Sequence, residues 1–215
     1  MLTLYAMPIS NFCAKVEIAL KLKELAYDYR APPDGYGSQR YKAIVPMGTI
    51  PALVDGDLVL SESEAILEYL DEAWRAPPLL PPTVAARARA RQLSRLHDSR
   101  FEPCVRSMFA TMSPTNRAAS DVAARLELLE RRYLEIANLA EPAPFLAGDN
   151  PGMPDCAFAP TLHLADRMLD VLNAPRLRHD RLEHWRSSIL AVPAFAEVLA
   201  RHDEAITAWL ATKGA

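Results

Sequence analysis

The sequence contains little glycine, and the glycines are unevenly distributed. Only seven of the 215 residues are glycine, and none lies between Leu58 and Ala147. Hairpin turns require positive φ and therefore favour glycine, so this scarcity excludes an all-β fold for most of the chain. Four of the seven glycines lie in the first 56 residues, and prolines cluster between Pro77 and Pro82. The sequence predicts two architectures joined near residue 80.

Several other features are missing as well. No apolar run approaches the ~18–20 residues needed to span a bilayer, and the N-terminus lacks the basic and apolar regions of a secretory signal. Three cysteines at unrelated positions fit neither a disulfide framework nor a zinc site. A formal net charge of −3 gives no basic footprint for nucleic acid. We therefore expect a cytoplasmic protein with reduced thiols, without a metal, and without nucleic-acid or membrane partners.

The first eighty residues alternate strand and helix patterns. An apolar run at 2–6 predicts a strand, and helical periodicity at 11–25 predicts a helix with Ser10 or Asn11 as its N-cap. A second strand is expected at 27–29. The Asp55-Gly56 turn predicts a hairpin of strands 51–54 and 58–60. The pattern Ser61-x-x-Glu64 resembles a capping box and predicts a helix that runs to about residue 74.

The rest of the chain follows helical patterns. Helices are expected at 84–112, 120–139, 154–173, 179–190 and 193–211, with a kink or division of the first at Pro103. Prolines bound the connections between them. The predicted fold is an α/β unit, its first two strands parallel, followed by an all-α helical bundle.

Three segments carry a resemblance to the cytosolic glutathione transferase family. IPALVDGDLVLSESEAILEYL (50–70) is similar to its V/I-P-x-L and E/Q-S-x-A-I-x-x-Y-L signature, and SNFCAKVEIAL (10–20) resembles the first helix of the serine-type zeta, tau, theta and phi classes. GDNPGMPD (148–155) resembles the start of the central helix of the second domain. The chain looks most like a bacterial, serine-type member.

The resemblance implies two domains with different roles. Residues 1–78 would form a thioredoxin-like domain that binds glutathione as co-substrate. Residues 84–215 would form an all-helical domain that contributes a hydrophobic pocket for the second substrate. The implied activity is a glutathione S-transferase that attacks small hydrophobic electrophiles in detoxification or catabolism. Family members are usually homodimers, so a homodimer is expected.

Ser10 is the candidate catalytic residue. The thiol of free glutathione has a pKa of ~8.5, and lowering it by ~2 units requires roughly 2.7 kcal/mol. A hydroxyl hydrogen bond contributes on the order of 1.5–3 kcal/mol, and a helix N-terminus adds ~0.3–1 kcal/mol. Spacing alone favours Ser10 as a plain N-cap, and the family resemblance is what implies its role as the partner of the thiolate. Cys13, in a first helical turn, is an alternative reactive residue, and its other interpretation is a small buried side chain.

The resemblance also implies the residues that hold glutathione. Glu62 and Ser63 would hold its γ-glutamyl end at a helix N-terminus, although spacing alone favours a plain capping arrangement. Ile50 would present its backbone to the cysteinyl unit, and the peptide before Pro51 would be cis. Asn11 is a further candidate donor.

The pattern departs from the family at two positions. Thr49 stands where several relatives carry Lys or Gln beside the glycine end of glutathione, so Gln39 or Arg40 is a candidate replacement. Gly152 stands where a Ser or Thr usually caps the central helix, while the acidic partner, Asp155, remains. A Gly cap costs only a few tenths of a kcal/mol, so the predicted fold does not change.

Candidates for the second-substrate pocket are apolar or aromatic residues of the predicted helices, together with one histidine: Phe12, Phe101, Met108, Phe109, Met112, Phe158 and His163. Aromatic and Met residues at helical spacing usually pack inward, so a core role is the simpler interpretation of each. A zeta-type glutathione-dependent isomerase or dehalogenase, and a non-catalytic glutathione- or partner-binding module, remain alternative functions.

Overall fold

A computed structural model describes residues 1–117 and 121–214. Its sheet has four strands in the order β2-β1-β3-β4, with bounds Leu2–Tyr5 (β1), Tyr27–Arg30 (β2), Ala52–Asp55 (β3) and Leu58–Ser61 (β4). β1 and β2 are parallel, whereas β3 is antiparallel to both β1 and β4. The predicted α/β unit with a parallel first pair is confirmed.

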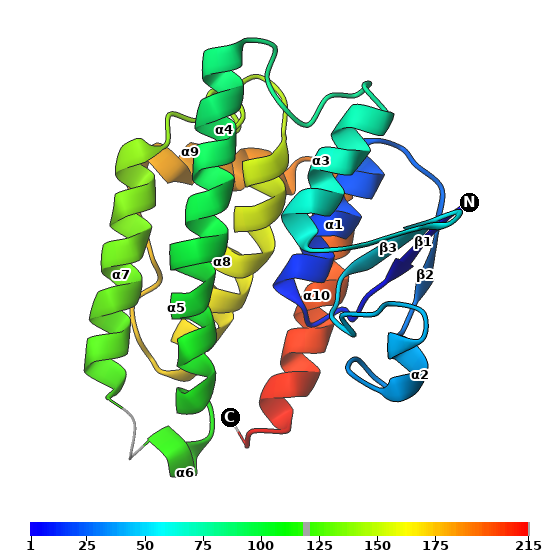
Figure 1. The fold of residues 1–215 in the computed structure, drawn as a ribbon. Coiled ribbons are helices and arrows are strands. Elements are labelled where there is room, and N and C mark those ends of the chain that lie inside the picture. Colours follow the sequence, from blue (N-terminus) through cyan, green and yellow to red (C-terminus); the bar gives the residue numbers. More distant parts are fainter. Residues whose placement is uncertain (118–120, 215) are drawn as a thin grey trace.

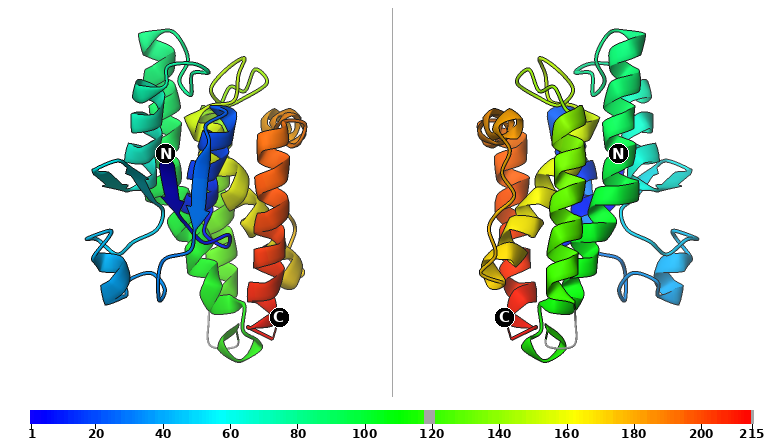
Figure 2. Two further views of the ribbon diagram at one scale, coloured as in Figure 1. Left: turned by 90° about the vertical axis from the view of Figure 1, so that its right-hand side faces the viewer. Right: turned by 90° about the vertical axis from the view of Figure 1, so that its left-hand side faces the viewer.

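Two long helices and one short helix accompany the sheet: α1 (Asn11–Leu22), α2 (Gln39–Lys42) and α3 (Ser63–Ala73). α1 packs against α3, and also against helices from the second half of the chain, α8 (Met153–Val171) and α10 (Pro193–Ala211) (Figures 1 and 2). Val16 and Leu20 on one face of the helix and Ile18 on the opposite face are therefore all fully buried. α1 forms the contact between the α/β part and the helical part.

The second half is all helical among its described residues. α4 (Val84–Leu96) continues through a π-helical segment (His97–Phe101) into α5 (Glu102–Ser107) and a 3₁₀ turn (Met108–Thr111). α6 (Pro114–Arg117), α7 (Val122–Leu139) and α9 (Asp180–Leu190) complete the bundle with α8 and α10. The expected break at Pro103 is present as the π segment that precedes it, because proline donates no N–H to the preceding turn. The expected start at Ser120 lies outside the described residues.

The capping-box prediction at Ser61 is wrong. α3 begins at Ser63, Glu62 occupies its N-cap, and that residue makes no side-chain capping bond. Glu64 is drawn inward instead: its Oε2 lies 2.6 Å from Nζ of Lys15 and 2.9 Å from Oγ of Ser94. A fully buried lysine needs an anionic partner, and this requirement outweighs local capping.

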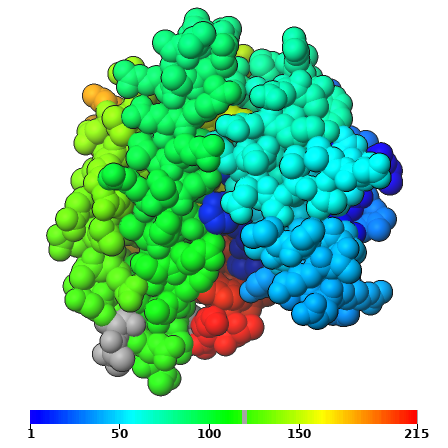
Figure 3. Space-filling model, viewed as in Figure 1, coloured from blue at the N-terminus to red at the C-terminus, as the bar shows by residue number. Residues whose placement is uncertain are grey.

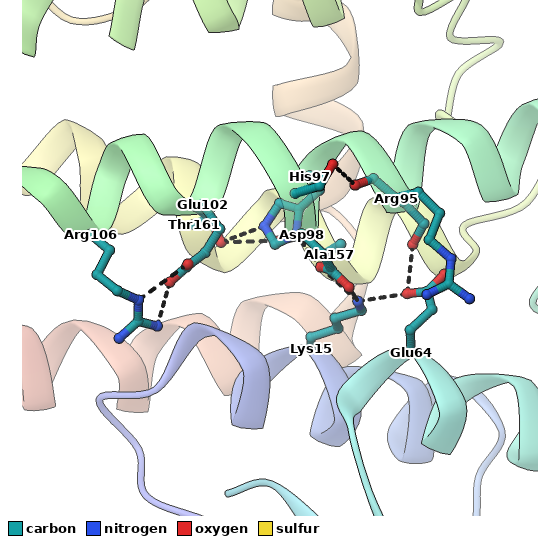
Figure 4. A network of polar contacts seen from close by, with 11 residues as sticks. Lys15, Glu64, Arg95, His97, Asp98, Glu102, Arg106, Ala157 and Thr161 are labelled. Atoms are coloured by element: carbon teal, nitrogen blue, oxygen red, sulfur yellow. Dashed lines mark hydrogen bonds and ion pairs between the residues drawn. The ribbon is translucent and has the colours of Figure 1, made fainter. Parts of the chain in front are cut away.

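A cluster of charged side chains joins the two parts of the molecule (Figure 4). Lys15 of α1 is fully buried and contacts Glu64 of α3 and both carboxylate oxygens of Asp98, each at 3.1 Å. Asp98 accepts a hydrogen bond from Nδ1 of His97, and Nε2 of His97 lies 2.7 Å from Oγ1 of Thr161 on α8. The cluster therefore connects α1, α3, the π segment and α8.

The start of α8 depends on Asp155 and on the small size of Gly152. The Asp155 carboxylate accepts hydrogen bonds from the backbone of Gly152 and Leu146 and from Nε1 of Trp185, at 2.7–2.8 Å. Burial raises the pKa of Asp155 to about 6, although these hydrogen bonds oppose the rise. A Cβ at Gly152 would lie 2.3 Å from the carbonyl oxygen of Leu79. The missing capping hydroxyl thus has a steric reason that was not evident from the sequence.

The apolar core is continuous from the sheet through α1 into the helical bundle. Among the described residues, no helix has the length and apolar character needed to cross a membrane.

Candidate functional site

The register of the sheet brings three predicted site segments to one edge. Tyr5 at the end of β1 pairs with Ala52 at the start of β3, and Ala52 pairs with Ser61 at the end of β4. Ser10 follows β1, the Ile50–Pro51 peptide directly precedes β3, and Glu62 and Ser63 directly follow β4. Segments separated by more than fifty residues in the sequence therefore leave the sheet at the same edge.

Ser10 is the N-cap of α1. Its Oγ accepts a hydrogen bond from the backbone N–H of Cys13 at 3.3 Å, and its carbonyl oxygen accepts from Ala14 N at 2.9 Å. The side chain is half-buried, lies close to the Cys13 thiol and lines the cleft described below. The hydroxyl can therefore cap the helix and donate outward to an anion at the same time.

Cys13 lacks the surroundings of a reactive cysteine. It is buried, and burial raises the pKa of its thiol to about 11, even though a hydrogen bond from Ser10 acts in the opposite direction. A reactive cysteine needs access to its partner and an accessible thiolate. The geometry favours the alternative in which Cys13 is a small core side chain.

The start of α3 is open in a different way. Glu62 has φ of 73° and makes no side-chain capping bond, and Ser63 is 6% exposed at the first helical position. The first N–H groups of a helix have no partner within the helix, and the helix dipole makes this end favourable for an anion. The arrangement suits a carboxylate held by backbone N–H groups beside the Ser63 hydroxyl.

The Ile50–Pro51 peptide is cis, as the resemblance implied. The turn before it is held by Tyr41, whose hydroxyl donates to the carbonyl oxygen of Thr49 at 2.9 Å. Gln39 and Arg40 lie on α2 with exposed side chains, and Arg40 Nη1 is 3.7 Å from Asp34 Oδ1. Neither belongs to the described lining of the cleft beside Ser10, whereas Thr49 does.

A cleft of about 520 Å³ lies beside Ser10, between the α/β part and the helical part (Figure 3). One wall comes from the first fifty residues and contains five predicted site residues: Ser10, Asn11, Phe12, Thr49 and Ile50. Met7, Ile9 and Tyr36 complete this wall. The opposite wall is formed by Arg106, Phe109, Leu164 and Trp209 from helical segments after residue 84. The cleft therefore combines a polar, serine-bearing edge with a largely apolar wall.

Most of the pocket candidates on the helices lie elsewhere. Phe101, Met108 and Met112 are fully buried in the core, so they do not provide a binding surface for a ligand. Phe158 is buried as well, whereas Phe109 lines the cleft. His163 lines a separate cavity of about 390 Å³ and lies 2.8 Å from Oδ1 of Asp203. Inward packing of apolar helical residues accounts for the first four placements.

Arg106 is the main feature of the cleft that sequence reasoning missed. Its guanidinium is bound by both oxygens of Glu102, at 2.5 and 3.2 Å, and the Glu102 side chain is 3% exposed. The Arg106 side chain is 55% exposed, and its Cζ lies 5.9 Å from the ring centroid of Phe12 and 5.8 Å from that of Phe109. In the sequence, Glu102 and Arg106 look like an ordinary i,i+4 surface pair, so only the packing identifies the arginine as a cleft residue.

Trp209 was missed for the same reason. It lies near the end of α10, and its ring stacks at a tilt on Phe109 with centroids 4.8 Å apart. Nothing in the sequence indicates which face of the last helix meets the cleft. Among the described residues, no group of three or more His, Cys, Asp or Glu side chains forms a candidate metal site.

Comparison with known proteins identifies the family. A family model described as "Glutathione S-transferase, N-terminal domain" matches residues 4–78. The chain is 31% identical to glutathione S-transferase Z2 of Arabidopsis thaliana over 200 residues, which cover 90% of this chain and 88% of that protein. The chain belongs to the glutathione S-transferase family.

Other members of the glutathione S-transferase family are similar over most of their length. The stringent starvation protein A homolog of Pasteurella multocida is 32% identical over 161 residues, covering 75% of this chain and 73% of that protein. A crystal structure of a glutathione S-transferase from Rhodospirillum rubrum F11 superimposes with a TM-score of 0.74 at 27% identity, covering 93% and 92% of the two chains. These matches confirm the predicted thioredoxin-like unit followed by a helical domain.

Proposed function

We propose that this chain is an active glutathione transferase that ionises the glutathione thiol and directs it at small hydrophobic electrophiles. The observation that carries the proposal is the common sheet edge from which the segments of Ser10, Ile50–Pro51 and Ser63 leave. Ser10 and Ile50 line the cleft, whereas Pro51, Glu62 and Ser63 are outside its lining. Such an edge offers a thiolate partner, an extended backbone and a carboxylate site at once. These are the three features that recognition and activation of the tripeptide require.

The thiolate is stabilised by Ser10 in this proposal. Its hydroxyl lines the cleft and can donate to the glutathione sulfur there, while the first turn of α1 adds its dipole. A hydrogen bond to a charged group contributes about 1.5–3 kcal/mol, which would lower the thiol pKa by about one to two units. No general base is required at neutral pH.

Glutathione is held at its other end by the start of α3. The γ-glutamyl carboxylate accepts hydrogen bonds from the first N–H groups of α3 and from Ser63, and the exposed Glu62 carboxylate pairs with the amino group. Asn11 and Thr49 are the remaining polar candidates on the cleft wall, and Gln39 and Arg40 are second choices for the glycine carboxylate. Residues 1–78 thus act as the glutathione-binding domain, and 84–215 supply the apolar wall for the electrophile.

The test combines binding with an activity panel. Calorimetric titration with glutathione should give saturable binding, and an aryl halide, an organic hydroperoxide, a mixed disulfide and a maleyl substrate should reveal the reaction class. Failure to bind glutathione contradicts the proposal. Binding without turnover of any substrate favours a non-catalytic glutathione- or partner-binding module.

A second candidate function is a zeta-type glutathione-dependent isomerase or dehalogenase of a carboxylate-bearing substrate. Arg106 favours it, because it is the one charged side chain among the described residues that line the cleft. Its exposed guanidinium, held by Glu102, can bind a carboxylate of the second substrate while Phe109 and Trp209 contact its apolar part.

A matched pair of aryl chlorides, one with and one without a carboxylate, tests this role. Arg106→Met should lower kcat/KM for the carboxylate substrate by about tenfold or more and leave the neutral substrate within about threefold. Arg100→Met is the control, because Arg100 has a similarly exposed side chain but lines a different cavity. Equal losses for both substrates would contradict carboxylate binding by Arg106.

We further propose that the protein is a cytoplasmic homodimer. Apolar side chains of Met47 and Val84 are 66% and 74% exposed, which is consistent with surfaces that a second copy covers. Light scattering at micromolar concentration tests the dimer, and a monomeric mass would contradict it.

A further inference from the structure

His202 of α10 contacts the segment that carries Ser10 on both sides of that serine. Its Nδ1 lies 2.6 Å from the carbonyl oxygen of Pro8, and its Nε2 lies 3.2 Å from Oδ1 of Asn11. His202 is 1% exposed and Asn11 is 4% exposed, so both contacts are shielded from solvent. The last helix and the first helix pack side by side in Figures 1 and 2.

Proton positions on the ring follow from its partners. A backbone carbonyl only accepts, so Nδ1 of His202 carries the hydrogen that Pro8 accepts. Burial, the largest effect, lowers the pKa of His202 to about 4, and the ring is therefore neutral at pH 7. Its Nε2 is then an acceptor, so the group of Asn11 that faces it is the amide nitrogen, which donates. This assignment rotates the Asn11 side-chain amide by a half-turn, which exchanges the positions of its nitrogen and Oδ1.

The two contacts restrain the backbone around Ser10 at two points. Pro8 precedes the serine by two residues and Asn11 follows it directly, while Ser10 N–H donates to the carbonyl oxygen of Met7 at 3.0 Å. The position of the serine hydroxyl is thereby defined relative to α10, which also carries the cleft residue Trp209. Because the hydroxyl must meet a sulfur atom in the cleft, small displacements of this segment matter.

We propose that His202 is a positioning residue of the active site: it holds the Pro8–Asn11 segment so that the Ser10 hydroxyl points at the glutathione sulfur. This inference rests on the proposed function, because it assigns His202 an effect on thiol ionisation. His202 does not line the cleft, and it acts through Pro8 and Asn11.

The neighbouring residue on α10 supplies a matched control. Asp203 binds His163 and Arg167 of α8 and makes no hydrogen bond with the Pro8–Asn11 segment. Asp203→Ala therefore removes polar contacts between α10 and a neighbouring helix without loosening the serine. Comparing it with His202→Leu separates a general loss of helix packing from a specific effect on Ser10.

Two measurements test whether His202 positions Ser10. Hydrogen exchange of the Cys13 and Ala14 amides, which bond to Ser10, should accelerate about tenfold or more in His202→Leu relative to amides of α7. In the same variant, the pKa of bound glutathione, followed by thiolate absorbance, should rise by about one unit. Its kcat should fall about tenfold, whereas its KM for glutathione should change less than about threefold. His202→Asn, which keeps a donor near Nδ1, should recover part of each effect, and Asp203→Ala should leave all of them unchanged.

The outcomes that overturn the inference are distinct from failure of the proposed function. If folded His202→Leu shows the exchange rates and thiol pKa of Asp203→Ala, His202 does not position Ser10. If the leucine variant does not fold, His202→Phe, which keeps a ring of similar size without a donor, decides in its place, and wild-type values in it overturn the inference. If the wild-type protein binds no glutathione, the proposed function fails, and unchanged exchange at Cys13 and Ala14 would still reject His202 as a restraint on this segment.

Discussion

The two helix starts at the edge of the sheet are built differently. α1 begins with Ser10, whose side chain caps the helix and lines the cleft, whereas α3 begins after Glu62, which has positive φ and provides no cap. The first start offers one hydroxyl donor to an anion beside the cleft. The second offers uncapped N–H groups that suit a carboxylate. The difference suggests that one edge of the sheet can bind two anionic groups of a single ligand with different donors, a side-chain hydroxyl at α1 and backbone N–H groups at α3.

The two helix starts are also held in place by different kinds of interaction. Lys15 of α1 forms a buried ion pair with Glu64 in the first turn of α3, so charge holds the second start. His202, a neutral ring, holds the segment before the first. The following predictions test this contrast, beginning with the largest expected effect.

Lys15→Met should be the most damaging substitution. It leaves the carboxylates of Glu64 and Asp98 without their buried cation, and breaking such a pair costs about 3–5 kcal/mol. Urea unfolding measures the loss. A loss below about 1 kcal/mol would show that the cluster does not hold α3 against α1.

Acidification should loosen the histidine-supported start. The unfolded chain takes up a proton at His202 near pH 6.5, whereas the folded protein does so only near pH 4, so folding stability falls as pH drops through this interval. The shift corresponds to at most about 3 kcal/mol. The free energy of unfolding between pH 7 and pH 4 should therefore fall more steeply in the wild type than in His202→Gln, and parallel curves would contradict a buried neutral His202.

Ser10→Ala should reduce kcat by about 10- to 100-fold, the equivalent of one hydrogen bond to a charged group. Glutathione affinity should stay within several-fold, because α3 holds the other end of the tripeptide. Ser10→Thr keeps a hydroxyl and should retain more activity. Steady-state kinetics with an aryl halide provide the measurement, and full activity of the alanine variant would remove Ser10 from its role.

Ser63→Ala should have the smallest effect and the opposite profile. It should weaken glutathione binding by about tenfold, measured by calorimetry, while the pKa of the bound thiol stays constant. Ser61→Ala is its control, since Ser61 resembles a cap in the sequence but makes no capping bond to α3. Equal effects of the two substitutions would reject the open helix start as a carboxylate site.

Sequence periodicity was sufficient for the fold, because strands, helices and turns depend mainly on local patterns. The helix at 11–25 and the Asp55-Gly56 hairpin were predicted within a few residues of their observed bounds. The local pattern failed at Ser61, where burial of Lys15 determines the direction of Glu64. It could not explain Gly152 either, since the obstacle is the distant carbonyl of Leu79.

The residues of the candidate site also fall into those that a sequence motif identifies and those that only the packing identifies. Ser10, Ile50 and Ser63 belong to a recognisable motif, so their shared edge could be anticipated once strand pairing was assumed. Arg106 and Trp209 could not, because the faces they present to the cleft depend on how the helices pack against the α/β part. Fully buried Phe101 and Met108 have the same apolar, helical character in the sequence as residues that line a pocket.

Thiol ionisation of bound glutathione tests the central claim most directly. Thiolate absorbance is titrated against pH in the wild type and in Ser10→Ala, each saturated with glutathione. The account predicts that the wild type lowers the thiol pKa by about one to two units from its free value of ~8.5, and that Ser10→Ala abolishes most of this shift and returns the pKa toward the free value. An equal pKa in the two proteins would contradict it.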